Sequence, residues 1–222
     1  MLRWLLPVVA LAVAVAYDLP GAEAQSRGRA GDFDYYVLSI SWSPSYCAAA
    51  GSRADPRQCD SGRPFAFVVH GLWPQYERGW PQFCRTDGRK RLRGREIDGI
   101  LDLMPSRGLI RHEWSKHGTC SGLSPQGYFR TVRQAWNKLV IPRRYERLES
   151  YLSIDPRSVE KDFLAANPKL RADAIAISCK GRRLTEVLVC MDRNLNFRRC
   201  EAVDRRGCRA RKVVMPPVRG HR

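Results

Sequence analysis

The order of apolar and polar positions predicts strands toward both ends of the chain and helices between them. Segments rich in aromatic and β-branched residues, bounded by Gly, Pro, Asn or Asp, are typical of strands. Five such segments are 34–42, 65–69, 174–178, 184–191 and 196–199, with a short last strand predicted at 212–215. The turn sequences Lys180-Gly181 and Asp192-Arg193-Asn194 separate the third, fourth and fifth segments. We therefore expect an antiparallel meander in the C-terminal half.

Apolar residues spaced three and four apart predict four helices in the middle of the chain. They cover 97–104, 109–116, the segment from Ser124-Pro125 to Pro142, and the segment from Asp155-Pro156 to Asn167-Pro168. Ser or Asp followed by Pro is a typical helix start, because the side chain caps the first turn and proline is tolerated there. Residues 105–108 are expected to form a break. Residues 48–62, which are polar and contain Pro and Gly, are expected to form a loop.

These elements predict an α+β fold, in which an antiparallel β-sheet forms the core of a single domain and the helices pack to one side. The full chain has 222 residues and shows no internal repeat, linker or heptad pattern. A basic C-terminal tail is expected from about residue 209. No pattern typical of oligomers is present, so we expect a monomer.

Residues 1–24 have the character of a signal peptide. Arg3 precedes a short apolar run, and Ala22-Glu23-Ala24 resembles a cleavage site. The apolar run is too short for a comfortable membrane span, so an uncleaved anchor is the less favoured alternative. We expect residues 25–222 to form the mature domain, exported to the periplasm or the medium without a stable membrane anchor.

The chain is strongly basic, with 39 Lys and Arg against 22 Asp and Glu and a formal net charge of +17. Positive charge of this size attracts polyanions and speeds their diffusional encounter with the protein. Charge alone does not distinguish RNA, DNA and an anionic membrane surface, and it also serves solubility.

Eight cysteines follow the predicted signal peptide, and an even number in an exported chain indicates disulfides. No Cys-x-x-Cys sequence is present, which disfavours a zinc ribbon or a thioredoxin-like centre. Local spacing suggests the pair Cys47–Cys59. Among the pairings open to the last four cysteines we favour the nested pairs Cys190–Cys200 and Cys179–Cys208. We thus expect a domain stapled by disulfides.

The four histidines are the main indication of chemistry. Two lie in the segment 111–120, one is His70 at the end of an apolar run, and His221 is next to the last residue. His112-Glu113 begins like a zinc-protease helix, but that pattern requires a second histidine four residues later. His117 is five residues later, about 140° around a regular helix, so zinc is disfavoured. We predict no metal ligand and no cofactor.

Acid–base chemistry is the alternative that the histidines favour. Small shifts around a pKa near 6.5 make one imidazole a base and another an acid near neutral pH. Lys116 beside them offers a cation for developing negative charge. Phosphoryl transfer on RNA fits these groups because RNA supplies its own nucleophile, the 2′-OH. The alternatives are a buried core position for His70, a surface lysine for Lys116 and a salt bridge for Glu113.

Two segments of this sequence resemble the two active-site segments of the ribonuclease T2 family. They are His70-Gly71-Leu72-Trp73-Pro74 and His112-Glu113-Trp114-Ser115-Lys116-His117-Gly118-Thr119-Cys120. Members of this family are exported, disulfide-bonded endoribonucleases that require no metal. The resemblance extends over roughly residues 35–208 and implies a disulfide between Cys84 and Cys120.

The resemblance also implies a role for each matching residue. His117 would be the general base for the 2′-OH, and His70 the general acid for the leaving 5′-oxygen. The first product would be a 2′,3′-cyclic phosphate, which is hydrolysed more slowly to a 3′-phosphate. His112 would hold the phosphate, and Glu113 and Lys116 would stabilise the transition state. DNA, which has no 2′-OH, would not be cleaved.

Base recognition is expected from aromatic residues after the first motif. The resemblance assigns base stacking to Trp73, and Tyr76 or Trp80 is a candidate for a second ring. Gln75 stands where better-known members have an acidic residue, and the second ring has no clean match in the family pattern. We expect low base specificity. Two rival functions are a cationic nucleic-acid-binding or envelope-binding protein without turnover, and a metallohydrolase.

Overall fold

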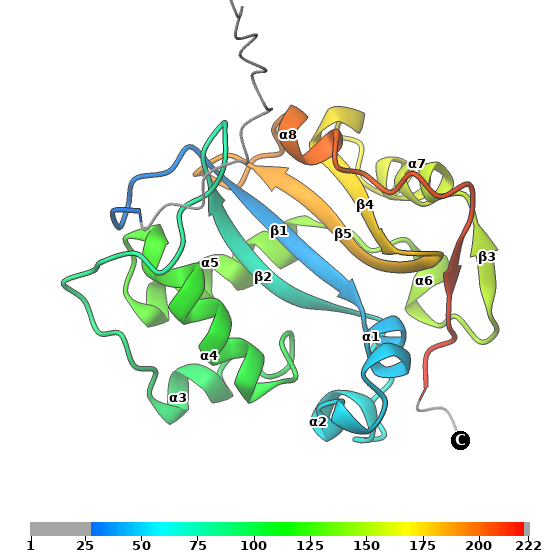
Figure 1. Cartoon of the computed structure of the whole chain (residues 1–222), viewed down its shortest axis with the longest axis horizontal. Helices are drawn as coiled ribbons and strands as arrows, with labels where there is room; N and C mark the ends of the chain where they lie inside the picture. The colour runs from blue at the N-terminus through cyan, green and yellow to red at the C-terminus, as the bar shows by residue number, and fades with distance from the viewer. Residues whose placement is uncertain (1–27, 220–222) are drawn as a thin grey trace, which may run out of the picture.

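The computed structural model describes residues 28–219, and its core is a six-stranded sheet (Figure 1). The predicted signal peptide and His221 lie outside the described residues. The strands are β1 (Tyr35–Trp42), β2 (Phe67–Gln75), β3 (Leu152–Ile154), β4 (Ile175–Lys180), β5 (Arg183–Met191) and β6 (Val213–Met215). The helices are α1 (Ser43–Ala50), α2 (Pro56–Cys59), α3 (Gly94–Asp98), α4 (Arg107–Lys116), α5 (Pro125–Lys138), α6 (Arg143–Glu146), α7 (Pro156–Ala166) and α8 (Glu201–Asp204).

The sheet has the strand order β2-β1-β5-β6-β3, and β4 also pairs with β5. The pairs β1–β2, β1–β5, β4–β5 and β3–β6 are antiparallel, as expected. The contact between β5 and β6, at Arg183 and Val214, is parallel. The sheet is therefore mixed at this one contact, whereas its other strand pairs have the predicted antiparallel arrangement. The parallel contact arises because the last strand enters beside the start of β5 after a long connection.

The main core lies between one face of the sheet and the larger helices. Tyr36, Leu38 and Ile40 of β1 point into it, as the period of two along a strand requires. Buried residues of α3, α4, α5 and α7 cover this face, so the prediction that the helices pack to one side is confirmed. The opposite face carries a smaller cluster that includes Val37, Cys190 and Val203, the last from the short α8. This second face holds the candidate site.

Strand β2 contains a β-bulge at His70. Ile40 pairs with Val69 and Ser39 pairs with Gly71, so His70 is an extra residue without a partner on β1. A bulge bends the strand and redirects side chains, and bulges are frequent beside active sites. The prediction that the strand ends before His70 is wrong, because β2 continues to Gln75. Pro74 is tolerated inside it because β2 is an edge strand.

Capping residues and first-turn prolines in the sequence predicted the starts of the longer helices to within two residues. Ser106 Oγ accepts a hydrogen bond from Leu109 N and starts α4 two residues earlier than predicted. Ser124 and Asp155 cap α5 and α7, in which proline occupies the first turn as expected. The helix predicted at 97–104 is shorter and begins earlier, as α3. The Glu96 carboxylate accepts a hydrogen bond from Arg93 N at 2.6 Å and so caps the N-terminus of α3.

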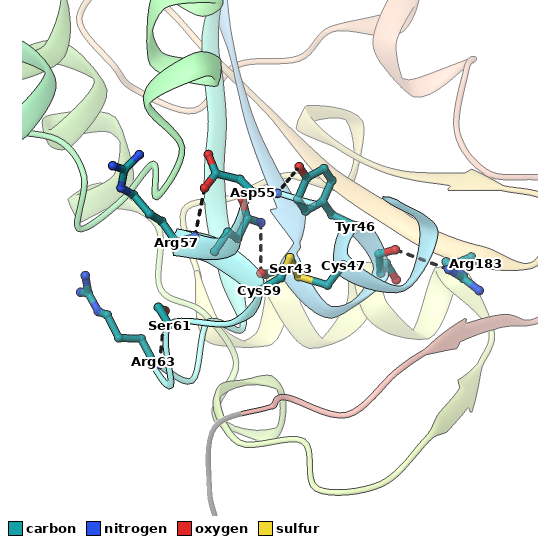
Figure 2. Close-up of a disulfide and its surroundings, with 11 residues drawn as sticks. Ser43, Tyr46, Cys47, Asp55, Arg57, Cys59, Ser61, Arg63 and Arg183 are labelled. Atoms are coloured by element: carbon teal, nitrogen blue, oxygen red, sulfur yellow. Dashed lines mark hydrogen bonds between the residues drawn. A yellow bond between two sulfur atoms is a disulfide. The ribbon is translucent and has the colours of Figure 1, made fainter. Parts of the chain in front are cut away.

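The predicted loop 48–62 is wrong in part, because α1 extends to Ala50 and α2 occupies 56–59. Three consecutive alanines favour the helical conformation at the end of α1, and a proline lies in the first turn of each helix. Figure 2 shows how the Cys47–Cys59 disulfide joins the two helices, with Asp55 N donating to the Tyr46 hydroxyl at 3.2 Å. Gln58 also donates to Ser43 Oγ at 3.0 Å.

The third strand predicted for the meander, at 196–199, does not form. Asp192 Oδ1 accepts hydrogen bonds from the backbone N–H groups of Asn194 and Asn196, and Leu195 adopts a φ of 63°. This compact turn leaves only one bridge, between Met191 and Phe197, before the chain turns toward α8. The side chain of Asp192 therefore competes successfully with strand pairing.

The disulfides join Cys47–Cys59, Cys84–Cys120, Cys179–Cys208 and Cys190–Cys200, which confirms the predicted pairing. Residues 209–219 belong to the fold rather than to a free tail, since Val213 and Met215 are fully buried. Trp42 Nε1 also donates to Pro216 O at 3.0 Å and attaches this segment to the end of β1. Within residues 28–219 no helix has the length and apolar character required to cross a bilayer.

Candidate active site

Strand β2 presents two aromatic side chains to the second face of the sheet. In a regular strand, residues three apart point to opposite faces. Because of the bulge, His70 and Trp73 face the same side, and their ring centroids lie 5.3 Å apart in an edge-to-face arrangement. Leu72 meanwhile stays in the main core. The bulge therefore places His70 and Trp73 on the same face of the sheet while Leu72 remains packed in the main core.

Helix α4 supplies the second half of the site from its buried stripe. Ile110, Glu113 and Trp114 are buried, and His117 continues this stripe at the C-cap. Glu113 is only 1% exposed. His112 and Lys116, four residues apart, lie at the edge of the stripe, and His112 is exposed. The two histidines of this motif thus occupy different environments, as their five-residue spacing predicts.

The two motifs meet at a cavity of about 450 Å³ on the second face. Its wall contains all five predicted catalytic residues, His70, His112, Glu113, Lys116 and His117, together with Val37, Trp73, Gln75, Trp80, Leu188, Val203 and Arg206. Trp73 lies against both imidazoles that the acid–base interpretation requires, with its ring centroid 5.4 Å from that of His117. Within residues 28–219 no group of three His, Cys, Asp or Glu side chains is arranged to bind a metal ion.

One hydrogen bond and one charge contact hold the Glu113 carboxylate at the centre of the site. Trp73 Nε1 donates to Glu113 Oε2 at 2.7 Å, and Glu113 Oε1 lies 3.6 Å from His70 Nε2. Behind them the Tyr128 hydroxyl donates to Leu72 O at 2.8 Å and holds β2 against α5. Gly71 lies directly under the Glu113–Trp73 pair, where a Cβ atom would overlap both partners.

The two histidines of the acid–base pair are shifted in opposite directions. Burial, with Lys116 and the other two cavity histidines, lowers the pKa of His117 to about 3. Burial also lowers the pKa of His70, but the hydrogen bond and charge of Glu186 and the charge of Glu113 outweigh it. The net result is a His70 pKa above its ordinary value of 6.5. Near neutral pH, His117 is therefore neutral, and the environment of His70 favours the protonated form.

The remaining charged groups of the site also respond to burial and to each other. Burial raises the pKa of Glu113, although His70, Trp73 and Lys116 oppose this. Partial burial and then the charge of Lys116 lower the pKa of His112. An accessible His112 beside Lys116 is suited to contact an anion at the mouth of the cavity.

Three of the four residues predicted to bind bases line the cavity: Trp73, Gln75 and Trp80. Gln75 is 9% exposed, and its Nε2 donates to Pro74 O at 3.1 Å. Tyr76 is not part of the cavity wall and packs against the main core instead. The side chain after Gln75 points away because alternation along the chain turns it to the other face.

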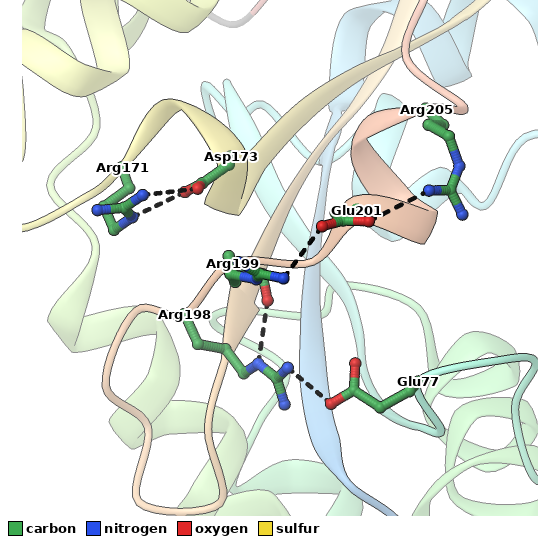
Figure 3. A network of polar contacts seen from close by, with 7 residues as sticks. All are labelled: Glu77, Arg171, Asp173, Arg198, Arg199, Glu201 and Arg205. Atoms are coloured by element: carbon green, nitrogen blue, oxygen red, sulfur yellow. Dashed lines mark hydrogen bonds and ion pairs between the residues drawn. The ribbon is translucent and has the colours of Figure 1, made fainter.

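The far wall of the cavity comes from segments that no motif indicated. Val203 and Arg206 follow the Cys190–Cys200 disulfide, and Arg206 lies over the Trp80 ring with its guanidinium carbon 5.4 Å from the centroid. Figure 3 shows the polar network that holds this segment, in which Glu201 pairs with Arg199 and Arg205. In the same network Arg198 reaches Glu77 on the loop after β2, at 2.7 Å.

A second cavity, of about 350 Å³, shares His70 and His112 with the first. Its other lining residues are Ser41, Tyr46, Gln58, Val68, Ser106, Gly108 and Leu109. It therefore lies between α4 and the two helices that the Cys47–Cys59 disulfide joins. His117 lines only the first cavity, whereas His70 and His112 stand between the two.

Comparison with known families supports the relationship that the motifs indicated. The model of the ribonuclease T2 family matches residues 33–200, which include both motifs. The chain belongs to the ribonuclease T2 family. A curated ribonuclease from Aeromonas hydrophila is 47% identical over 120 residues, which are 54% of this chain and 53% of the relative. A probable ribonuclease from Haemophilus influenzae is 34% identical over 123 residues, 50% of this chain and 45% of the relative. The matches thus span about half the length of these relatives.

Solved structures of a ribonuclease and of a ribonuclease-related protein have a similar fold. An RNase-related protein from Calystegia sepium has a TM-score of 0.67 at 23% identity, covering 84% of this chain and 98% of that one. RNase NT in complex with 5′-AMP has a TM-score of 0.58 at 28% identity, covering 84% of this chain and 99% of that one.

In this member of the ribonuclease T2 family, the site combines three chemical capacities. One imidazole, His117, favours its neutral form and can accept a proton, the surroundings of His70 favour a protonated imidazole that can supply one, and Lys116 can stabilise an anion. All three line one cavity whose aromatic wall suits a nucleobase. Glu186, which contacts His70, is a further polar residue beside this site that the motifs did not reveal.

Proposed function

We propose that this chain is an exported, monomeric endoribonuclease that cleaves single-stranded RNA without a metal ion and with low base specificity. The observation that carries the proposal is the pairing of His70 and His117 in one cavity with opposite pKa shifts. Membership of the ribonuclease T2 family supports the reaction class. The complex of RNase NT with 5′-AMP supports a nucleotide ligand for this fold.

The first step is transphosphorylation within the RNA. His117 takes the proton of the 2′-OH while this oxygen attacks the adjacent phosphorus atom. His70 donates its proton to the 5′-oxygen as the P–O5′ bond breaks. Lys116 and His112 meet the charge on the phosphate oxygens, and Glu113 lies beside the acid. The products are a 2′,3′-cyclic phosphate and a free 5′-hydroxyl.

The second step reverses the proton transfers. His70, now neutral, takes a proton from water, which attacks the cyclic phosphate. His117, now protonated, returns its proton to the 2′-oxygen as the P–O2′ bond breaks. The product is a 3′-phosphate, and both histidines return to their starting states. We expect this step to be the slower one.

The two cavities support a direction for the bound RNA. The nucleoside that supplies the 2′-OH must lie beside His117, and therefore in the larger cavity with Trp73 and Trp80. The leaving nucleoside then lies beyond His70, in the smaller cavity with Tyr46. The larger cavity offers mainly ring and aliphatic surfaces to a base, which is consistent with low base specificity.

Export is proposed from the predicted signal peptide and from the disulfides, because disulfides persist in oxidising compartments. A short RNA and the matching DNA, incubated with the protein in EDTA, test the proposed function directly. We expect RNA cleavage with cyclic phosphate ends and intact DNA. Loss of cleavage in EDTA would indicate a metallohydrolase. Tight binding of RNA without cleavage would mean that the charge, rather than the histidines, serves the function.

The pH dependence of kcat/KM should be bell-shaped with an unusually wide acidic side. The base must be unprotonated, so the rate rises with pH through the His117 pKa of about 3. The acid must be protonated, so the rate falls as pH rises through the His70 pKa, which lies above 6.5. Initial rates on a dinucleotide, measured across this range at constant ionic strength, test the prediction. A maximum confined to alkaline pH would contradict it.

A further inference from the structure

Glu186 lies beside the proposed acid although it belongs to neither motif. Strand β1 separates β2 from β5, and Ser41 of β1 pairs with Val68 on one side and with Glu186 on the other. Glu186 therefore faces the same side of the sheet as Trp73 and Leu188. It directly precedes the apolar run 187–191 of β5, and its side chain is only 20% exposed. A carboxylate at such a position requires a partner.

That partner is the imidazole of His70. Glu186 Oε1 and His70 Nδ1 form a hydrogen bond between residues 116 positions apart in the sequence. An ionised carboxylate only accepts hydrogen bonds, so Nδ1 carries the proton. The bulge leaves His70 without a partner on β1, and this contact therefore sets the direction of its ring. The other nitrogen, Nε2, is on the side of Glu113, 3.6 Å from Oε1.

We propose that Glu186 is a positioning residue for the acid step, a role that rests on the proposed function. Its carboxylate fixes the orientation of His70 and holds the imidazole in its protonated form, with Nε2–H directed at the leaving oxygen. During the reaction the proton on Nε2 moves to the 5′-oxygen, while the proton on Nδ1 stays in the hydrogen bond to Glu186. Carboxylates behind a functional imidazole act in this way at other catalytic sites.

Several other charged or titratable groups also face His70. Glu113 from α4 favours the protonated ring, whereas Lys116 opposes it. His112 and His117 couple to His70 from the same helix and its C-cap, and Tyr46 of α1 lines the cavity that they share. Among these groups, Glu186 makes the direct hydrogen bond to His70 and exerts the largest upward influence on its pKa.

The test compares Glu186→Gln with the control Glu149→Gln, which removes the same charge from an exposed position between α6 and β3. On a dinucleotide, Glu186→Gln should lower kcat/KM by about 10- to 100-fold. Its alkaline pH limb should move to lower pH, because the protonated His70 loses its counter-charge. On a nucleoside 3′-(4-nitrophenyl phosphate), whose leaving group needs no proton, the loss should nearly vanish. Glu149→Gln should match the wild type on both substrates.

The alternatives give different results. Equal losses on both substrates, with an unchanged pH limb, would mean a merely structural role and overturn the proposal. Unchanged dinucleotide cleavage in a folded Glu186→Gln would overturn it as well. An NMR titration of the His70 ring gives a readout independent of turnover, and its pKa should fall in Glu186→Gln and in Glu186→Ala. If the wild type itself fails to cleave RNA, the proposed function fails, whereas the titration still reports on the contact.

Discussion

Replacing His117 by alanine should lower kcat/KM for RNA by about 10²- to 10⁴-fold, the usual contribution of a positioned general base. The chain has no ready substitute in the cavity. The contact with Glu186 favours the protonated form of His70, and His112 is exposed at the rim. Initial rates on a dinucleotide at the pH optimum measure the effect.

The four histidines provide a matched control for this experiment. His221→Ala removes an imidazole outside both motifs and should retain wild-type activity. His117→Gln keeps more of the buried volume than alanine, and so separates lost chemistry from lost packing. Wild-type rates in a folded His117→Ala would exclude His117 as the base and would leave the opposite pKa shifts without a catalytic meaning.

Replacing Gly71 by alanine should damage the site by a different route. The added Cβ would overlap Glu113 Oε2 and Trp73 Nε1, two atoms that are hydrogen-bonded to each other at 2.7 Å. Either the pair separates or β2 moves, and a displacement of about 1 Å at a catalytic site costs roughly 100-fold in rate. Overpacking at a buried position should also lower the free energy of unfolding by about 1–3 kcal/mol.

Gly94→Ala is the control for Gly71→Ala, because its Cβ would meet only ordinary contacts at the exposed start of α3. It should leave the rate unchanged and should stabilise the protein by up to about 1 kcal/mol, since alanine favours the helix. Neither glycine has a positive φ, so backbone strain does not distinguish the two substitutions. They differ in the space that is available to the added Cβ atom. Equal activity of the two variants would show that the Glu113–Trp73 contact is dispensable.

Features encoded by neighbouring residues were predictable from the sequence. The capped starts of α5 and α7 depend on Ser124 and Asp155, and the aromatic and β-branched run of β1 is a local pattern. That the two motifs form one site was inferred from their resemblance to the active-site segments of the ribonuclease T2 family. The structure brings all five matching catalytic candidates to one cavity. The disulfide pairing followed partly from spacing and partly from the same resemblance.

Features that depend on distant partners were not predictable. The contact of Glu186 with His70 requires knowledge that β1 lies between β2 and β5. Strand β3 has only three residues and exists because β6 pairs with it. Val203 and Arg206 contribute to the wall of the cavity because of the path that the chain takes after Cys200. A charged residue inside the apolar pattern 184–191 was nevertheless a usable signal for Glu186.

The bulge in β2 has a consequence for how this protein tolerates changes in length. Between Val69 and Trp73 the number of residues, and not only their identity, decides which side chains face the core. Deleting one residue there would remove the bulge and restore the regular alternation of side chains along β2. On one side of the deletion, side chains that face the core would then face the cavity, and the reverse. Loops elsewhere absorb insertions and deletions easily. Variation in chain length among functional relatives should therefore be rare at this point and frequent in the connections that surround it.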